Sequence, residues 1–240
     1  MKKRIVEITL VALVLVGLTL VIWHAGLDLR LAGMVVGPDN TWPGVGRAPW
    51  SLLYHWAPLP AFVLAGGSLL LVVAGYLSAR WRKFRRDALF ILLFLALGPG
   101  LLVNVVLKDH VGRARPREVV QYGGSHPFTE IWQPGDTGRN SSFPSGHASV
   151  AFFVIAPWFV LRDRNRRLAL AFLVSGTLFG IAVGWARILQ GGHFLSDVLW
   201  AGGLDYLVGA LLALAMGLNR TRDPGRRRTP GNSLINEPRG

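Results

Sequence analysis

Three short clusters of basic and histidine residues, each beside an apolar segment, carry the groups with which this chain could do chemistry: Lys108-Asp109-His110-Val111-Gly112-Arg113-Ala114-Arg115-Pro116, then Pro144-Ser145-Gly146-His147, then Arg187, His193 and Asp197. Fixed cations can bind the oxygens of a phosphate group, and one imidazole can attack its phosphorus atom. A carboxylate can hold that imidazole in the reactive tautomer while a second imidazole protonates the leaving oxygen. The clusters therefore predict a site that binds a phosphate and cleaves it off.

His193 is the predicted nucleophile, because three residues separate it from Asp197 and one helical turn then places both side chains on one face. The carboxylate of Asp197 can accept the proton on one ring nitrogen of His193 and leave the other nitrogen free to attack. Attack gives a phosphohistidine, which water hydrolyses. His147 is the predicted general acid, at the start of an apolar segment where helix N-terminal amides can bind phosphate oxygens.

Five further residues are predicted to bind the phosphate: Lys108, Arg115, Arg187, Ser145 and Gly146. The three cations stabilise the charge that the equatorial oxygens carry in the transition state. Gly146 permits close approach of the backbone, and Ser145 is also suited to cap the following helix. No carboxylate cluster or histidine pair makes a convincing metal site, so the predicted mechanism uses neither a metal nor another cofactor.

The order and spacing of these clusters resemble the type 2 phosphatidic acid phosphatase family, which includes integral-membrane lipid phosphatases and the related vanadium haloperoxidases. The family's pattern is Lys, six residues, Arg-Pro; then Pro-Ser-Gly-His; then Ser-Arg, five residues, His, three residues, Asp. All three parts are present here between residues 108 and 197. The chain departs from the pattern at Ala186, where the family usually has Ser, and the lost hydroxyl removes no central catalytic group.

The resemblance implies a membrane lipid phosphatase whose substrate is undecaprenyl pyrophosphate, phosphatidylglycerol phosphate, phosphatidic acid or a phosphate of lipid A. The Gly-Arg-Ala-Arg-Pro and Gly-Gly…Phe-Thr elements are similar to those of lipid A phosphatase-like members. A lipid phosphotransferase of the same fold stays open. An anionic-lipid transporter or binding protein would also use the cations, but it has no need of Asp197 behind His193. A haloperoxidase is disfavoured, because a membrane bundle suits a lipid substrate.

The apolar residues of this chain are gathered in long runs, and 51% of its 240 residues are hydrophobic while 16% are charged. About 20 apolar residues are needed to cross a bilayer. We expect six spans, near residues 5–23, 59–78, 89–107, 147–161, 168–186 and 198–218. The prediction is one all-α domain over residues 1–220, a six-transmembrane helical bundle, followed by a basic tail at 221–240 that is expected to be disordered. The first run is long for a signal peptide and is interpreted as a retained helix.

The distribution of the 26 Lys and Arg residues, which contribute to a net charge of +13, predicts the orientation of the bundle. Given six spans, 18 of these cations fall on the side of both termini and 8 on the other side. Cytoplasmic loops carry the excess of Lys and Arg, so both termini are predicted to be cytoplasmic. All three clusters then lie at the outer, periplasmic face of a bacterial inner membrane. The basic tail suits anionic lipid head groups, and no nucleic-acid partner is predicted.

Two outer loops have compositions that bear on access to the site. The loop near residues 27–58 carries aromatic residues that either anchor the protein at the membrane interface or line the access of a lipid head group: Trp42, Trp50, Tyr54 and Trp56. The loop from 117 to 143 is long and rich in Gly, Ser and Pro, and we expect it to cap the site.

Several charged or titratable residues around the clusters match no motif position. Arg113, Arg117 and Arg139 either add a positive field that suits an anionic head group or are solvated surface charges. His110 and His126 are expected to have no catalytic role. The absence of cysteine excludes disulfides, thiolate metal sites and cysteine nucleophiles.

Overall fold

The computed structural model describes residues 2–138 and 141–218, and the predicted tail at 221–240 lies outside them. Over these residues the regular structure is helical, which confirms the predicted all-α class. Within the described part of the chain, five segments are long and apolar enough to cross a membrane: Lys2–His24, Trp50–Leu77, Arg82–His110, Arg166–Leu189 and Leu195–Ala215. The protein is therefore an integral membrane protein.

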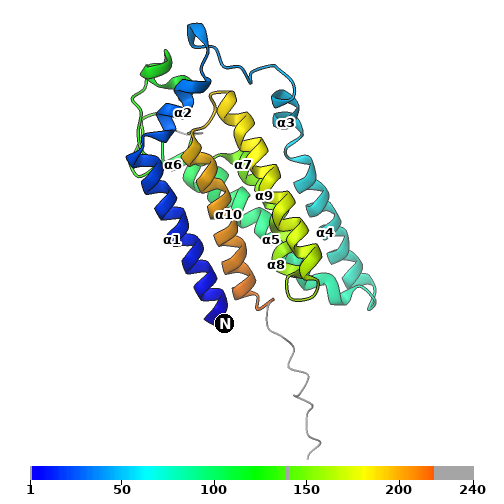
Figure 1. Ribbon diagram of the computed structural model, residues 1–240. Helices are drawn as coiled ribbons and strands as arrows, with labels where there is room; N and C mark the ends of the chain where they lie inside the picture. Colours follow the sequence, from blue (N-terminus) through cyan, green and yellow to red (C-terminus); the bar gives the residue numbers. More distant parts are fainter. Residues whose placement is uncertain (1, 139–140, 219–240) are drawn as a thin grey trace, which may run out of the picture.

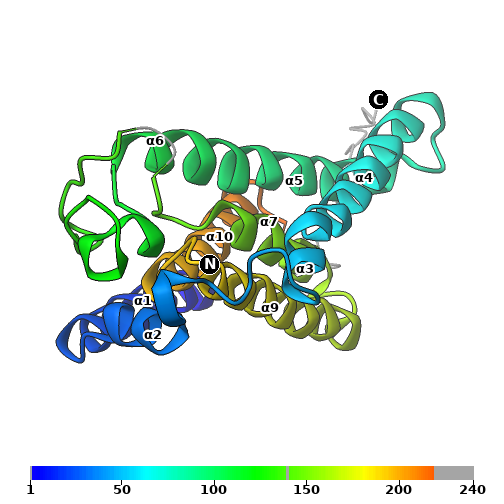
Figure 2. The ribbon, with the colours of Figure 1, turned by 90° about the horizontal axis from the view of Figure 1, so that it is seen from above.

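The elements run in the order α1 (Lys2–His24), α2 (Leu27–Val35), η1 (Pro38–Asn40), α3 (Trp50–Trp56), α4 (Leu59–Leu77), η2 (Arg82–Phe84), α5 (Arg85–Leu95), η3 (Ala96–Leu107), α6 (Lys108–His110), η4 (Pro116–Glu118), η5 (Val120–Tyr122), α7 (Gly146–Phe152), η6 (Phe153–Ile155), α8 (Ala156–Leu161), α9 (Arg166–Leu189) and α10 (Leu195–Ala215). Figure 1 shows the long helices side by side, with α2 and α3 at one end of the bundle and the N-terminus at the other. Figure 2 shows α7 and α10 between the α5–α6 segment and α9.

The span predicted at 147–161 corresponds to the shorter apolar segment Gly146–Leu161, which comprises α7, η6 and α8. This segment contacts η3, α9 and α10, and most of its residues are buried. Three glycines spaced four residues apart on α9 allow the close contact: Gly176, Gly180 and Gly184. An added Cβ at these positions would collide with the α7–η6 segment or with the first turn of α10. The segment therefore lies in the middle of the bundle and has little lipid-facing surface.

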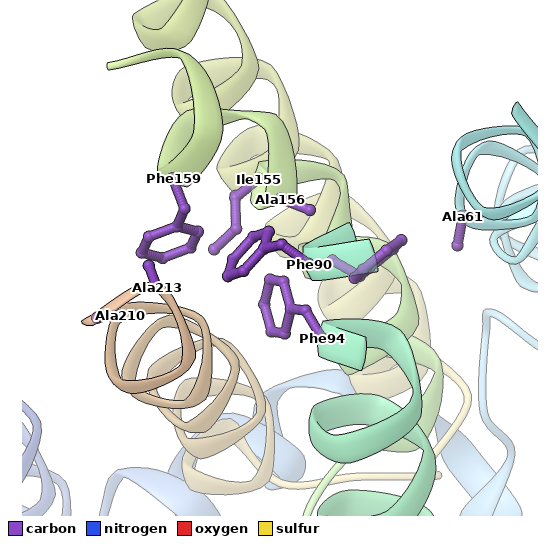
Figure 3. Packing of buried hydrophobic residues seen from close by; sticks show 9 residues of the cluster. Ala61, Phe90, Phe94, Ile155, Ala156, Phe159, Ala210 and Ala213 are labelled. Atoms are coloured by element: carbon purple, nitrogen blue, oxygen red, sulfur yellow. The ribbon is translucent and has the colours of Figure 1, made fainter. Parts of the chain in front are cut away.

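A cluster of aromatic rings fills the half of the bundle that lies nearer the N-terminus. Phe90 and Phe94 of α5 pack against Phe159 of α8 with ring centroids 5.9 Å apart, and Phe153 lies 5.3 Å from Phe94. Small residues of α10, among them Ala210, cover the rings, as Figure 3 shows. Packing of this kind joins α5, α8 and α10 into a rigid support for the opposite end.

A π-helical segment, η3, continues α5 to the end of the bundle where the sequence cluster that begins at Lys108 lies. It contains Pro99, which has no N–H to donate to the preceding turn, and this favours a widened turn. Asn104 of η3 donates from Nδ2 to the carbonyl oxygen of Pro99 at 2.7 Å. The Oδ1 atom of Asn104 lies so close to Gly146 that any Cβ there would collide with it. This contact fixes the start of α7 against η3.

The opposite end of the bundle is held by charged side chains near the N-terminus. Arg4 donates to Asp163 at 2.8 Å, which joins α1 to the turn before α9. Glu7 of α1 accepts hydrogen bonds from Arg162 and from the Tyr206 hydroxyl, each at 2.6 Å. The N-terminus, the α8–α9 turn and the lower part of α10 therefore form one end, away from the three sequence clusters.

Candidate active site

Residues from all three sequence clusters line one cavity at the end of the bundle where α2 and α3 lie. The cavity has a volume of about 500 Å³. Five of the predicted site residues line it: Lys108, Arg115, His147, Arg187 and His193. The other lining residues are Val45, Gly46, Ser51, Tyr54, His55, Arg117 and Gln190. The described lining thus contains four cations and no carboxylate, a composition that suits an oxyanion.

His193 lies in the turn between α9 and α10 and is 1% exposed. Its Nδ1 atom is 2.7 Å from the carbonyl oxygen of Ser142. A carbonyl can only accept, so Nδ1 must carry the proton and Nε2 keeps its lone pair. Burial, with smaller contributions from Arg187 and Lys108, lowers the pKa of His193 to about 3, although Asp197 acts in the opposite direction. The ring is therefore neutral, with a nucleophilic nitrogen available.

Asp197, which is fully buried, orients His193 in a different way from the direct hydrogen bond that the spacing predicts. Its Oδ2 atom is 3.7 Å from Nδ1 of His193, beyond a normal hydrogen bond. Oδ2 instead accepts from the Ser142 hydroxyl at 2.5 Å and from the backbone N–H of Phe194 at 2.7 Å, while Oδ1 accepts from Arg113 at 2.5 Å. Asp197 caps the first turn of α10 and holds Ser142, and Ser142 in turn holds the imidazole.

His147 is the second residue of α7, is half-buried, and is held by an aromatic contact. Its ring stacks on Tyr54 of α3, with centroids 4.4 Å apart and an angle of 24° between the planes. The guanidinium carbon of Arg187 lies 4.7 Å from the centroid of the same tyrosine ring. Tyr54 therefore lines the site rather than anchoring the chain, whereas Trp56 on the same helix is 62% exposed.

Ser145 and Gly146, which the sequence assigns to phosphate binding, are not among the described residues that line the cavity. Ser145 is buried and caps α7, because its Oγ accepts from the N–H of Ala148 at 3.4 Å. Its own N–H donates to the carbonyl oxygen of Asp197 at 3.1 Å. Gly146 gives α7 room to pack on Asn104. In this structure both residues position His147, and their role in phosphate binding stays a prediction.

The cations reach the cavity from different segments. Lys108 begins α6 at the end of the π-helical segment. Arg115 precedes Pro116, and its backbone N–H donates to Glu118 at 3.0 Å, which fixes the turn that carries it. Arg117 is attached to the α9–α10 turn, because its N–H donates to the carbonyl oxygen of Gly191 at 3.2 Å. Arg117 therefore adds positive charge at the cavity, one of the two roles that the sequence left open.

Gln190 holds Arg187 and was not found by sequence reasoning. Its Oε1 accepts from Nη1 of Arg187 at 2.5 Å. Its Nε2 donates to the carbonyl oxygens of Gly44 and Trp50 at 3.3 and 3.4 Å, so it joins the loop before α3 to the end of α9. The position of Gln190, between Arg187 and His193, is the only signal in the sequence.

Arg113 is fully buried and is not among the described residues that line the cavity, so it is not a solvated surface charge. Its guanidinium group donates to Asp197 and to Asp28 of α2. Burial disfavours the charged form, but the two carboxylates outweigh it and raise the pKa of Arg113. Sequence reasoning also missed Asp28, which lies in the short helix α2 and has no motif around it. Arg139 lies outside the described residues.

The described residues of the loop from 117 to 143 do not cap the cavity, contrary to the sequence expectation. Among its described residues only Arg117 lines the cavity. Trp132 of this loop instead packs edge-on against Trp23 of α1, with centroids 5.5 Å apart. Apolar residues such as Tyr122 bury the loop against α2. The segment from 45 to 55 covers the cavity in its place.

Known proteins of similar sequence point to one family. The sequence matches the family described as the PAP2 superfamily over residues 87–222. It is 39% identical over 130 residues to the lipid A 4'-phosphatase of Francisella tularensis subsp. novicida, covering 52% of this chain and 56% of that protein. It is 39% identical over 123 residues to the lipid A 4'-phosphatase of Rhizobium leguminosarum, covering 50% of this chain and 51% of that protein. The chain thus spans about half the length of these curated relatives.

Two further matches come from Bacillus subtilis. Phosphatidylglycerophosphatase B is 28% identical over 150 residues, which cover 60% of this chain and 66% of that protein. The crystal structure of a transmembrane PAP2 type phosphatidylglycerolphosphate phosphatase superposes with a TM-score of 0.57 at 21% sequence identity. That superposition covers 90% of this chain and 98% of the other, and it shows that the two share a fold.

Proposed function

The chain belongs to the PAP2 superfamily, and we propose that it is a membrane lipid phosphatase that works through a phosphohistidine on His193. The observation that carries the proposal is a single cavity lined by Lys108, Arg115 and Arg187 together with a neutral, buried His193 and the stacked His147. A binding protein would need the cations. It would have no use for an imidazole whose Nδ1 proton is fixed and whose Nε2 lone pair is free.

The first chemical step joins Nε2 of His193 to phosphorus and breaks the bond between phosphorus and the lipid oxygen. The electron pair of that bond goes to the lipid oxygen, which takes a proton from His147. The Nδ1 proton stays on the imidazole and remains hydrogen-bonded to Ser142. In the second step His147 takes a proton from water, the water oxygen attacks phosphorus, and inorganic phosphate leaves His193 free.

The cations act mainly in the transition state. Negative charge is spread over the three equatorial oxygens of the transferring group, and the cations are already in place before reaction. Gln190 accepts a hydrogen bond from Nη1 of Arg187, so the remaining donors of that guanidinium can face the cavity. Tyr54 lies beside both Arg187 and His147 and keeps the acid next to the phosphate-binding group.

A phosphate monoester of lipid A is the substrate that we favour. The relatives at 39% identity carry the name lipid A 4'-phosphatase, whereas the match to phosphatidylglycerophosphatase B is 28% identical. The lining of the cavity supports a doubly charged head group, because it offers four cations without a carboxylate. Phosphatidylglycerol phosphate, phosphatidic acid and undecaprenyl pyrophosphate are the alternatives to test beside it.

We further propose six spans over one domain, residues 1–220, with Gly146–Leu161 as the sixth and the cavity at the periplasmic face. Residues of α3 line the cavity, and Figure 1 shows α3 at the end of the bundle opposite the N-terminus. The connection between α4 and α5, which carries Arg80, Arg82 and Lys83, lies at the N-terminal end. The positive-inside rule then places the cavity outside. Single cysteines at Gly123 and Lys83 test this orientation: a membrane-impermeant reagent applied from outside should label only the first.

The decisive experiment measures phosphate release from lipid A and the three alternative lipids by the purified protein in nanodiscs, with His193→Ala as the control. We expect inorganic phosphate from lipid A with the native chain and none with the variant. Release that survives in His193→Ala would refute the mechanism, and no release from any lipid would refute the function. Label that moves to a second lipid instead of appearing as inorganic phosphate would identify a phosphotransferase.

A further inference from the structure

Asp28 and Arg113 form a buried ion pair directly behind Asp197, and neither residue lines the cavity. Asp28 belongs to α2, the short helix at the outer end of the bundle, and Arg113 to the loop after α6. We propose that this pair positions the nucleophile: it holds Asp197, and through Asp197 it holds Ser142 and His193. The inference rests on the proposed phosphohistidine chemistry.

Arg113 is the centre of the arrangement and has no exposed surface. Its Nη1 donates to Asp197 at 2.5 Å and to the Ser196 hydroxyl at 2.8 Å, and its Nη2 donates to Asp28 at 2.9 Å. Its Nε donates to the carbonyl oxygen of Thr129 at 2.8 Å. A planar guanidinium with several directed donors can bridge two carboxylates in one geometry, which a lysine cannot do.

Aromatic rings complete the enclosure of this guanidinium. Its central carbon lies 4.6 Å from the ring centroid of Phe194 and 5.3 Å from that of Phe128. The rings exclude water, and buried charges are screened much less than exposed ones. The charges of Arg113 and Asp28 therefore act on Asp197 with little screening by water.

The charges of the cluster explain why two carboxylates are needed. Arg113 alone would neutralise Asp197, whereas Arg113 with Asp28 and Asp197 leaves one net negative charge beside His193. The imidazole gains positive charge as Nε2 bonds to phosphorus, because Nδ1 keeps its proton. A negative cluster behind the ring stabilises that change, and removal of Asp28 cancels it without touching any group in the cavity.

Asp28 also fixes α2 to the helix that carries Asp197. Its Oδ1 accepts from the backbone N–H of Ser196 at 2.9 Å, and its Oδ2 accepts from the Ser196 hydroxyl at 2.5 Å. Ser196 lies in the first turn of α10, one residue before Asp197. These bonds would also serve folding alone, so the test must separate a positioning role from a structural one.

The test is Asp28→Asn, with Asp39→Asn as the matched control, since Asp39 is an exposed acid of η1, the short element that follows α2, and lies outside the cluster. We expect Asp28→Asn to lower kcat roughly tenfold or more, because a charge-assisted buried contact is lost. KM and inhibition by vanadate should change less than about twofold, because the oxyanion-binding cations are untouched. Asp39→Asn should match the native chain in all three measurements.

A double-mutant cycle with Asp197→Asn then asks whether Asp28 acts through Asp197. If it does, Asp28→Asn has little further effect on kcat in the Asp197→Asn background. An equal loss in both backgrounds, an unchanged kcat in the single variant, or a loss confined to KM would overturn the proposal.

If Asp28→Asn loses vanadate binding through misfolding, Ser196→Ala replaces it, because that variant removes a shared hydroxyl without changing charge. A kcat of native size in Ser196→Ala would then count against the proposal.

The activity of the native chain in the same assay distinguishes failure of the proposed function from failure of the proposed role of the ion pair. A native chain that releases no phosphate from any lipid refutes the proposed function. An active native chain with an equally active Asp28→Asn variant refutes only the role of the ion pair.

Discussion

The two histidines of the cavity are held in opposite ways. On the nucleophile side, formed by Ser142, His193 and Asp197, the ring is 1% exposed and is fixed by a 2.7 Å hydrogen bond to a backbone carbonyl. On the acid side, formed by Tyr54 and His147, the ring of His147 is half-buried and stacks on Tyr54, with ring centroids 4.4 Å apart.

The difference follows from what each ring has to do. A nucleophile needs one tautomer and one direction of its lone pair, and directed hydrogen bonds supply both. A general acid must give a proton to the lipid oxygen and later take one from water. A stack restrains the plane of the ring and leaves its nitrogens free to exchange protons. The nucleophile side is therefore rigid, and the acid side is accessible.

The largest expected effect comes from deleting each ring in turn. His193→Ala should abolish turnover and phosphoenzyme formation with every substrate, because no other group takes the place of Nε2. His147→Ala should lower the rate ~10²–10⁴-fold on a lipid phosphate, the usual contribution of general acid catalysis. An activated aryl phosphate, whose leaving group needs no proton, should recover part of the loss in His147→Ala and none in His193→Ala. The recovery should appear in kcat/KM, which reports the step that forms the phosphohistidine.

Trapping with labelled substrate checks the same assignment directly. Label on His193 should accumulate in the His147→Ala variant, where the water step is slowed. Label that maps to His147, or that persists in His193→Ala, would exchange the roles of the two sides.

The pH dependence gives the next effect. Because the pKa of His193 is lowered to about 3, its ring stays unprotonated as the pH falls from 7 to 5. A histidine with the ordinary pKa of 6.5 would be ~97% protonated at pH 5, a loss of about 30-fold in the reactive form. We expect no such loss in kcat/KM for His147→Ala on an aryl phosphate, once the substrate's own second ionisation has been measured and subtracted.

The His147→Ala background matters here, because it removes the titration of the acid side. A remaining acid limb near pH 6.5 would show that His193 is solvated in the working enzyme. It would then be held no more rigidly than His147.

A smaller effect is expected at Ser142, whose hydroxyl joins Asp197 to the carbonyl that fixes His193. Ser142→Ala keeps the backbone carbonyl but removes the hydroxyl contact that holds this residue in position. It also removes one hydrogen-bond donor from the buried carboxylate of Asp197. The loss of a charge-assisted hydrogen bond costs ~1.5–3 kcal/mol, so kcat should fall at least roughly tenfold. Ser141→Ala is the matched control, because the Ser141 hydroxyl donates to the Phe143 carbonyl at 3.2 Å and not to Asp197, so its loss should matter much less. Equal losses in both variants would mean that the loop is weakened in general.

Ser142 also illustrates what the sequence could and could not predict. The helical class follows from the apolar runs, and five predicted site residues line one cavity because their motifs are local in sequence and meet at one end of the bundle. Ser142, Asp28 and Gln190 are polar residues outside those motifs. Each contacts residues that are distant in the sequence, and spacing along the chain does not encode such contacts.

The two outer loops show the same limit. The 117–143 loop has the composition of a lid, yet its apolar residues pack on α1 and α2, and the burial of those residues decides where it lies. The sequence left Tyr54 as either an interfacial anchor or a residue that lines the access of the head group. Helix α3 is oriented so that the Tyr54 ring stacks on His147. Composition identifies a loop that can bury rings, but the neighbouring helices determine which surface the rings cover.

The smallest effect is expected on the acid side, at Tyr54 itself. Tyr54→Phe keeps the ring that stacks on His147, so it should act on lipid phosphates at nearly the native rate. Tyr54→Ala removes the stack, and an aromatic pair contributes about 0.5–1.5 kcal/mol, so the rate should fall roughly 2- to 10-fold. The loss should appear in kcat/KM with a lipid phosphate and largely vanish with an aryl phosphate, because only the lipid leaving group needs the proton of His147 in the step that forms the phosphohistidine. Arg187 also lies against this ring, so a loss of equal size with both substrates would show that Tyr54 supports phosphate binding instead. In that case the acid side would not be held by the stack, and the contrast between the two histidines would rest on burial alone.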